Sequence, residues 1–293
     1  MGPVLVTGAS GQIGSRLASL LRASGHQVVA VDIRPSASER IELSDITRDD
    51  QVARLFGSGS IRTVVHLAAV LPTAFRADPI AGGEVNVTGT LKLLRAAVQH
   101  GVGRFVQGSS MSVYGSSDTS RALNEHDLTA PDEPYGAAKR AVELVGESLA
   151  AATGLDFVSL RIARVVGPGA TNTASSWRSQ IFEASLSPGQ LPILIPFAPT
   201  ARLSLTYVDE VARMLMLLAE AADIPRRIYN SPVEVWETRH LAELVEQARN
   251  VPVRLGEAQG GPICDGTAFS EDFDFRLRGL ADYLSSRCGD TGA

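Results

Sequence analysis

The residue pair with the clearest chemical meaning is Tyr135 and Lys139. The chain has 27 basic residues, but only Lys92 and Lys139 are lysines. Tyr135 precedes Lys139 by four positions, and residues at this spacing share one face of a helix. An ammonium is a compact charge that can approach a phenol, whereas a guanidinium is a planar fork. The spacing therefore predicts a phenol and an ammonium side by side on one helix.

A tyrosine in this setting can act as a base. The ordinary pKa of a phenol is near 10, so only about 0.1% of it is ionised at pH 7. Lowering that pKa by about three units requires about 4 kcal/mol of phenolate stabilisation. A neighbouring ammonium and the positive charge of an oxidised nicotinamide ring are two sources of such stabilisation. Tyr135 and Lys139 therefore point to redox chemistry with a nicotinamide cofactor.

The amino-terminal residues provide a place for that cofactor. The apolar run at residues 3–6 predicts a buried strand, and a glycine-rich segment at residues 7–14 follows it directly. Helical spacing of apolar residues comes next, and residues 28–31 predict a second strand. Glycines at the start of a helix let the backbone approach a pyrophosphate. The predicted cofactor contacts in this segment are Gly8, Ser10, Gly11, Gln12, Ile13 and Gly14.

Asp32 closes the second predicted strand. A carboxylate at this position can accept hydrogen bonds from both hydroxyls of the adenosine ribose, and it repels a 2′-phosphate. Arg34 lies close enough in the sequence to weaken this preference. The prediction is that the cofactor is NAD rather than NADP.

These motifs together resemble the NAD-dependent epimerase/dehydratase family of extended short-chain dehydrogenases/reductases, over residues 3 to about 250. The resemblance extends to segments 45–46, 66–69, 86–90, 109–115, 167–169 and 207–212. It implies further cofactor contacts from Asp45, Ile46, Leu67, Ala68, Ala69 and Asn86. It also implies a catalytic set of Ser110, Tyr135 and Lys139, in which Tyr135 and Lys139 contact the cofactor as well.

The reaction is also implied by this resemblance. Tyr135 would remove the proton from a secondary hydroxyl while NAD accepts a hydride from the same carbon. Ser110 would bind the substrate and steady its developing carbonyl oxygen. Lys139 would lower the pKa of the Tyr135 phenol and hold the nicotinamide ribose.

The order of predicted elements indicates the fold class. Apolar strand-like runs alternate with helical patterns, which predicts an α/β protein with a Rossmann-type doubly wound parallel sheet and a small discontinuous C-terminal substrate-binding domain. We expect residues 1–168 and 204–229 to form the NAD-binding domain. The substrate-binding domain would comprise residues 169–203 and 230–293, and we expect substrate-binding loops between about residue 165 and Tyr207. Residues 265–274 are acidic and predict a loop.

Three arginines are candidates for substrate binding. Arg164 stands where nucleotide-sugar enzymes of the family have an asparagine, and residues 197–205 depart from a second family pattern. Arg164, Arg178 and Arg202 could bind a carboxylate or a diphosphate. Two substrate classes remain open: a nucleotide sugar, for an epimerase or dehydratase, and a small polyhydroxy, sugar-acid, hydroxy-acid or amino-acid substrate, for a net dehydrogenase. A noncatalytic NAD-sensing regulator is a minor alternative.

The composition of the chain argues against several classes of binding partner. A net charge of −5 without basic clusters argues against nucleic acid and anionic membranes. Because there is no 18-residue apolar span and no signal peptide, we expect a cytoplasmic protein. Cys264 and Cys288 predict free thiols, and neither the cysteines nor the five histidines have the spacing of metal ligands. Apolar residues on more than one face of the helix after Tyr135 predict a homodimer contact, which the resemblance also implies.

Overall fold

A seven-stranded parallel sheet forms the centre of the computed structural model, which describes residues 2–36, 40–57, 61–116, 121–169, 175–183 and 192–285. Its strands are β1 (Val4–Thr7), β2 (Val28–Asp32), β3 (Glu42–Leu43), β4 (Thr63–His66), β5 (Arg104–Ser110), β7 (Asp156–Ile162) and β11 (Ile228–Asn230). Their order is β11-β7-β5-β4-β1-β2-β3. Strand β2 pairs with one edge of β1 and β4 pairs with its other edge. The strand order therefore reverses at β1, as in a doubly wound sheet. The predicted Rossmann-type α/β fold is confirmed.

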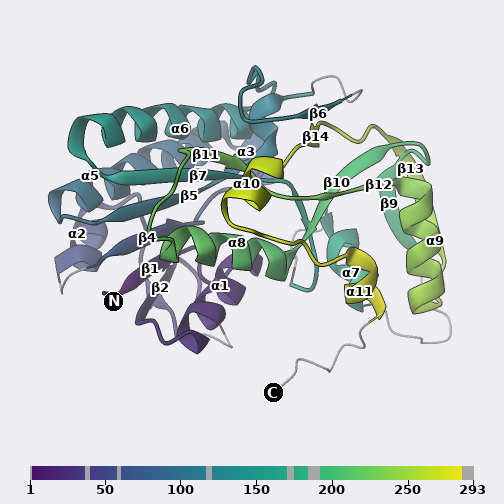
Figure 1. The fold of residues 1–293 in the computed structure, drawn as a ribbon, viewed down its shortest axis with the longest axis horizontal. Helices are drawn as coiled ribbons and strands as arrows, with labels where there is room; N and C mark the ends of the chain where they lie inside the picture. Colours follow the sequence, from purple (N-terminus) through teal and green to yellow (C-terminus); the bar gives the residue numbers. More distant parts are fainter. Residues whose placement is uncertain are drawn as a thin grey trace.

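Helices cover both faces of this sheet (Figure 1). One face carries α2 (Asp49–Gly57), α5 (Thr90–Gln99) and α6 (Pro134–Thr153), and the other carries α1 (Gln12–Ala23) and α8 (Val208–Glu220). Side chains of β1 alternate between the faces, so Val4 and Val6 pack with α1 and α8 while Leu5 packs with α2 and α5. Two buried apolar layers therefore hold the strand ends in place.

The long helix α6 is fixed by residues at its ends and middle. Pro134 occupies its first turn, where a missing N–H costs nothing, and Gly154 ends it with a left-handed φ of 77°. At Gly146, a Cβ atom would lie 2.2 Å from the ring of Phe157 on β7. The glycine therefore lets α6 lie close against the sheet, which fixes the distance between this helix and the neighbouring strands.

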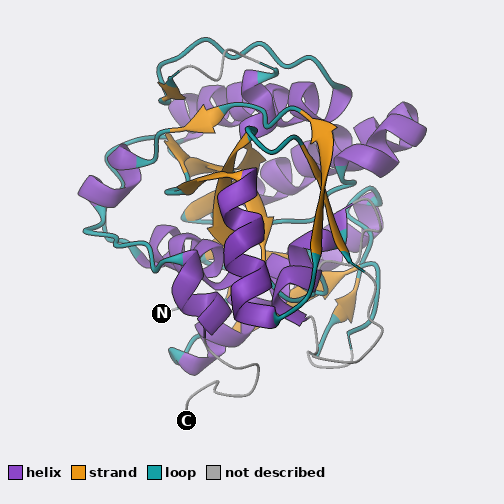
Figure 2. Cartoon of the chain, turned by 90° about the vertical axis from the view of Figure 1, so that its right-hand side faces the viewer, coloured by secondary structure: helices purple, strands orange, loops and turns teal. Residues whose placement is uncertain are grey.

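The C-terminal part of the chain builds smaller sheets beside the main one (Figures 1 and 2). A three-stranded sheet contains β8 (Arg164–Val166), β10 (Arg202–Tyr207) and β12 (Glu234–Glu237), and two-stranded pairs join β9 (Ile193–Phe197) to β13 (Val253–Ala258) and β6 (Ala122–Leu123) to β14 (Ile263–Cys264). The helices of this region are α7 (Trp177–Glu183), α9 (Thr238–Arg249), α10 (Thr267–Asp272) and α11 (Leu280–Ser285). A separate apolar cluster stabilises this part.

Two local expectations need correction. The segment expected to hold only substrate-binding loops contains α7 and β9 among its described residues. The acidic segment 265–274 contains α10 instead of a loop, because Phe269 and Phe273 pack against Tyr229. Cys264 is a buried free thiol, and Cys288 lies outside the described residues.

The described residues contain no helix that is both long and apolar enough to span a membrane. In the same part of the chain, no group of three His, Cys, Asp or Glu side chains is arranged to hold a metal ion.

Candidate active site

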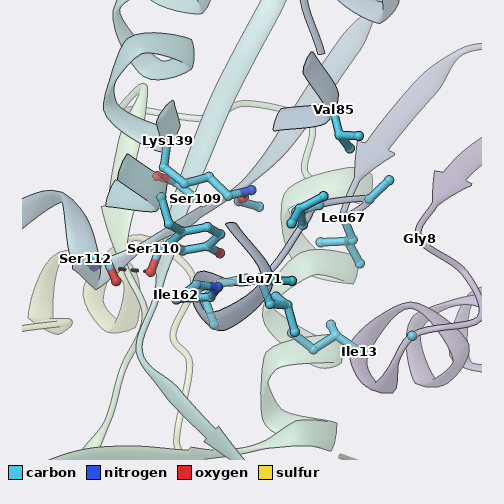
Figure 3. Close-up of a pocket in the computed structure, with 18 of the residues that line it drawn as sticks. Gly8, Ile13, Leu67, Leu71, Val85, Ser109, Ser110, Ser112, Lys139 and Ile162 are labelled. Atoms are coloured by element: carbon cyan, nitrogen blue, oxygen red, sulfur yellow. Dashed lines mark hydrogen bonds between the residues drawn. The ribbon is translucent and has the colours of Figure 1, made fainter. Parts of the chain in front are cut away.

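A cavity of about 1400 Å³ lies where the parallel strands end. Its walls come from the ends of β1, β2, β4 and β5, from the start of α6, and from the β8 and α7 region. Open α/β sheets bind ligands at this edge, and the volume exceeds the roughly 300–1,000 Å³ of an ordinary small-molecule pocket. Gly8 and Ile13 lie toward one end, and Ser110 and Lys139 lie toward the other (Figure 3). The cavity can therefore hold a cofactor and a substrate together.

The glycine end has the shape that a dinucleotide requires. Gly8 has φ of 71°, and a Cβ atom there would lie 2.6 Å from the backbone nitrogen of Ala68. A Cβ atom at Gly14 would lie 2.2 Å from the carbonyl oxygen of Gly8. Gly11 precedes α1 without a side-chain cap, so N–H groups of the first helical turn remain free for a ligand. This cradle fits the pyrophosphate of NAD.

Asp32 is held at the edge of the cavity. Its carboxylate accepts hydrogen bonds from the backbone nitrogens of Ser10 and Arg34, each at 3.1 Å. The exposed guanidinium of Arg34 lies 3.9 Å from the same carboxylate. A carboxylate at this place in the cavity wall fits the ribose hydroxyls of NAD better than the 2′-phosphate of NADP.

Most other predicted cofactor residues also line the cavity, namely Gly11, Gln12, Ile13, Asp45, Ile46, Leu67, Ala68 and Ala69. Ser10 and Asn86 do not. The hydroxyl of Ser10 donates to the carbonyl of Arg34 at 2.6 Å. The amide of Asn86 accepts from the nitrogen of Val70 at 2.7 Å and donates to its carbonyl at 2.9 Å. The structure therefore places Asn86 behind the cavity wall, where it fixes the loop after β4.

The three predicted catalytic residues meet at the other end. Ser110 ends β5, and Tyr135 and Lys139 come from the first two turns of α6. The Ser110 hydroxyl lies near that of Tyr135 and acts to lower the pKa of the phenol. Ser110 Oγ also accepts from the nitrogen of Ser112 at 3.2 Å (Figure 3). Lys139 Nζ lies 5.7 Å from the centre of the Tyr135 ring and donates to the Gly108 carbonyl at 2.7 Å. All three catalytic side chains are buried.

Burial dominates the electrostatics of this group. It raises the pKa of the Tyr135 phenol to about 12, although the Ser110 hydroxyl acts in the opposite direction. Burial lowers the pKa of the Lys139 ammonium to about 8, and the charge of Glu143 opposes that fall. In the protein alone, desolvation of the phenolate therefore outweighs the lowering expected from Lys139. Additional positive charge must come beside Tyr135 before it can act as a base near neutral pH.

Arg164 and Arg178 line the substrate end. The guanidinium of Arg164 lies 4.6 Å from the ring centre of Phe197 and donates from Nη2 to the carbonyl of Gly260 at 3.1 Å. Arg164 Nη1 and Arg178 Nε are buried without a hydrogen-bond partner in the described structure. Burial and the nearby Arg178 lower the pKa of Arg164 to about 9, and burial lowers that of Arg178 to about 10. These donors are available to an anion.

Arg202 lies apart from this pair. It is exposed at the start of β10, opposite Glu237 in the register with β12. There it lines a separate pocket of about 440 Å³. Arg164 on β8 pairs with Leu205, three residues further along β10. The register of the small sheet therefore keeps Arg202 out of the wall that Arg164 and Arg178 form.

The cavity wall also contains residues that the motifs did not single out. They include Val70, Leu71, Glu84, Val85, Asp132, Glu133, Ile162, Ala163 and Pro262. Leu71 and Val85 are drawn in Figure 3. Leu71 follows shortly after the predicted contacts at the end of β4, so its place could be inferred from the sequence. Pro262 reaches the cavity only because β14 pairs with β6, which no local pattern reveals.

Residues 4–231 match the model of the NAD dependent epimerase/dehydratase family. The chain belongs to this family. It is therefore an NAD-dependent enzyme of the extended short-chain dehydrogenase/reductase type, as the motifs predicted.

Individual relatives differ in their reactions. The chain is 36% identical to a UDP-glucose 4-epimerase of Halalkalibacterium halodurans over 172 residues, which are 56% of this chain and about half (51%) of that enzyme. It is 28% identical to the mitochondrial L-threonine 3-dehydrogenase of Bos taurus over 282 residues, 89% of this chain and 74% of that one. A solved structure of MoeE5 with UDP-glucose and NAD has a TM-score of 0.83 and 31% identity, and the match covers 98% of this chain and 97% of that one.

The geometry assigns roles in hydride-transfer chemistry. When bound, NAD supplies the hydride acceptor. In the predicted mechanism, the Tyr135 phenolate would take the proton of the substrate hydroxyl, and the Ser110 hydroxyl would donate to the substrate oxygen as the carbonyl forms. Lys139, fixed by the Gly108 carbonyl, places a positive charge behind the phenol. Burial of the three side chains limits their contact with water.

Proposed function

We propose that this enzyme acts on a nucleotide sugar, oxidising a secondary alcohol of the sugar as the first step of an epimerase or dehydratase reaction. The carrying observation is the pair of half-buried arginines, Arg164 and Arg178, which line the cavity and each have one buried guanidinium nitrogen without a hydrogen-bond partner in the described structure. In the described part of the chain, no carboxylate is among the groups that shift the pKa of either guanidinium. Buried charges are normally paired, so a negatively charged ligand is the missing partner.

The charge of the pair favours a diphosphate. Two guanidiniums can each bind one phosphate of a nucleoside diphosphate, and each can do so with two parallel hydrogen bonds. A single carboxylate would neutralise only one of them. A zwitterionic amino acid would also bring its ammonium toward two positive charges. The cavity volume supports the same choice, because about 1400 Å³ leaves room for a nucleotide beside the cofactor.

A net dehydrogenase of a small acidic substrate is the second candidate. It is supported by the alignment with L-threonine 3-dehydrogenase, which spans more of the chain than the alignment with UDP-glucose 4-epimerase. Arg164 also stands where nucleotide-sugar enzymes of the family carry an asparagine. A carboxylate would bind Arg164, and Arg178 would then remain without a partner.

A substrate panel separates these candidates. The enzyme is incubated with NAD and, in turn, UDP-glucose, UDP-glucuronic acid, threonine, uronic acids and aldonic acids. We expect a changed UDP-sugar without accumulation of NADH, because an epimerase or dehydratase returns the hydride to its product. Steady production of NADH from threonine or a sugar acid, with both UDP-sugars unchanged, would favour the second candidate. If the protein binds NAD but converts none of these compounds, the result would favour the alternative of a noncatalytic NAD-sensing regulator.

We further propose that the protein is a cytoplasmic homodimer that associates through α6. Leu144 and Val145 are exposed on this helix, with exposed fractions of 52% and 43%. Exposed neighbouring apolar residues on a helix favour contact with a second copy. Light scattering should give the mass of a dimer, and Leu144→Glu with Val145→Glu should give the mass of a monomer.

A further inference from the structure

The last residues of β5 contact α6 at successive points. Lys139 donates to the Gly108 carbonyl, and the Ser110 hydroxyl lies near that of Tyr135, whose pKa it lowers. The residue between them, Ser109, donates from its hydroxyl to Glu143 at 2.6 Å. Glu143 lies one helical turn beyond Lys139, so the three α6 residues recur at a spacing of four. The mechanism above uses the first two contacts and leaves Glu143 without a role.

Glu143 is the most enclosed acid near the catalytic residues. Its side chain is fully buried, and Arg161 on β7 binds both carboxylate oxygens, at 3.0 and 2.8 Å. Arg140 donates to the same carboxylate at 3.0 Å. Four hydrogen bonds, counting that of Ser109, therefore fix one carboxylate. These hydrogen bonds hold the carboxylate in one place.

The charges around Glu143 are unbalanced. Lys139, Arg140 and Arg161 bring three positive charges close to this single carboxylate. Guanidiniums do not lose protons in proteins, whereas a buried ammonium readily does. If the charge of Glu143 were removed, Lys139 would therefore be the group to give up its proton.

We propose that Glu143 is a positioning residue of the active site, and that its carboxylate, held by Ser109 and Arg161, keeps the buried side chain of Lys139 in the ammonium form that the reaction needs. The proposal concerns the chemistry of Tyr135 and Lys139. It therefore stands independently of which substrate the enzyme uses.

Other titratable groups near Lys139 do not replace Glu143. Tyr135, on the same helix, is neutral because burial raises the pKa of its phenol. His66 on β4 is also neutral, because burial and the charge of Lys139 lower its pKa to about 3. Arg161 on β7 is bonded to Glu143 and adds a positive charge. In the described structure, Glu143 is the group whose charge favours protonated Lys139.

The presence of only two lysines makes the proposal directly measurable. In protein labelled with [¹³C]lysine, NMR shows one set of signals for Lys139 and one for Lys92, which the variant Lys92→Arg assigns. Glu143→Gln should move the deprotonation of Lys139 to lower pH by about one unit or more. Lys92 is an internal reference, because its ammonium contacts Asp49 and the Thr47 carbonyl instead. Glu147→Gln, one turn further along α6, is the matched control and should move neither titration.

A purely structural role for Glu143 predicts a different result. Folded Glu143→Gln protein in which Lys139 titrates at the wild-type pH would overturn the proposal. Because this variant leaves Arg161 buried without its partner, it can fail to fold. The double variant Glu143→Leu with Arg161→Met then provides the test, since apolar residues of similar volume replace the ion pair. Lys139 should titrate at lower pH in the double variant than in Arg161→Met alone, because these two proteins differ only at position 143, and an equal titration in both would also overturn the proposal.

Discussion

The ammonium of Lys139 lies 5.7 Å from the centre of the Tyr135 ring, yet its hydrogen bond goes to the backbone carbonyl of Gly108. Lys139 is therefore fixed to β5, and any effect that it has on Tyr135 would come from its charge. Because burial raises the pKa of Tyr135 to about 12, the phenol depends on positive charge beside it for activity near neutral pH. This dependence makes the roles of the two side chains separable by substitution.

Tyr135→Phe removes the proposed base while it preserves the ring. We expect kcat to fall by about 100- to 10,000-fold, because general base catalysis contributes effects of that size. Fluorescence titration with NAD should show nearly unchanged binding, and circular dichroism should show an unchanged fold. Turnover close to that of the wild type would remove Tyr135 from the mechanism.

Asp32→Ala tests the cofactor preference. The carboxylate is held by two backbone nitrogens at the cavity edge, so its loss should weaken NAD binding by about 10- to 150-fold, the effect of a lost charge-assisted hydrogen bond. NADP binding should weaken less or improve, because the repulsion of its 2′-phosphate disappears. Dissociation constants of both cofactors measure the change. Equal binding of NAD and NADP by the wild type would contradict the assignment.

Arg164→Ala and Arg178→Ala test the anion site. Each should raise KM for an active substrate by about 10- to 150-fold, since each removes a charge-assisted contact in a buried place. Arg202→Ala is the matched control, because Arg202 is exposed on β10 and lines the other pocket. Its KM should stay within about twofold of the wild type. A rise in KM for Arg202→Ala equal to the other two would place the anion elsewhere.

The lowered pKa of His66 should make the folded protein less stable in acid. Its ring bonds to Thr7 and Thr90, and burial, together with the charge of Lys139, lowers its pKa to about 3. Between about pH 6.5 and pH 3 the unfolded chain holds a proton that the folded chain lacks, so stability falls as pH falls through this window. From pH 7 to pH 5 the loss should be about 2 kcal/mol. Urea unfolding should show a smaller loss in His66→Gln, whereas His240→Gln, exposed on α9, should match the wild type.

Much of the cofactor site could be predicted because its residues follow one another along the chain. The glycines, the end of β1 and the start of α1 form one continuous segment, and Asp32 closes the next strand. Tyr135 and Lys139 share a helix, so their spacing alone indicated their proximity. These local relationships survive folding because a strand or helix fixes the relative positions of near neighbours.

The remainder depends on pairings between distant segments. Nothing near Arg164 or Arg202 indicates that β8 pairs with β10 in a register that separates the two side chains. The role of Asn86 depends on Val70, which a loop brings beside it. Glu143 meets Ser109 and Arg161 only when α6 packs across β5 and β7.

Helix α8, from the later part of the sequence, packs against α1 near the N-terminus, and this packing limits how early the core between them can form. On the α1 side of the sheet, Val211, Met214, Leu215 and Leu218 of α8 belong to the apolar core that also contains Leu17 and Leu21. The ribosome must therefore synthesise and release residues 208–220 before this core can close. Contacts of such long sequence separation slow folding and leave the early strands exposed in the meantime. We expect the nascent chain to depend on chaperones until α8 has emerged.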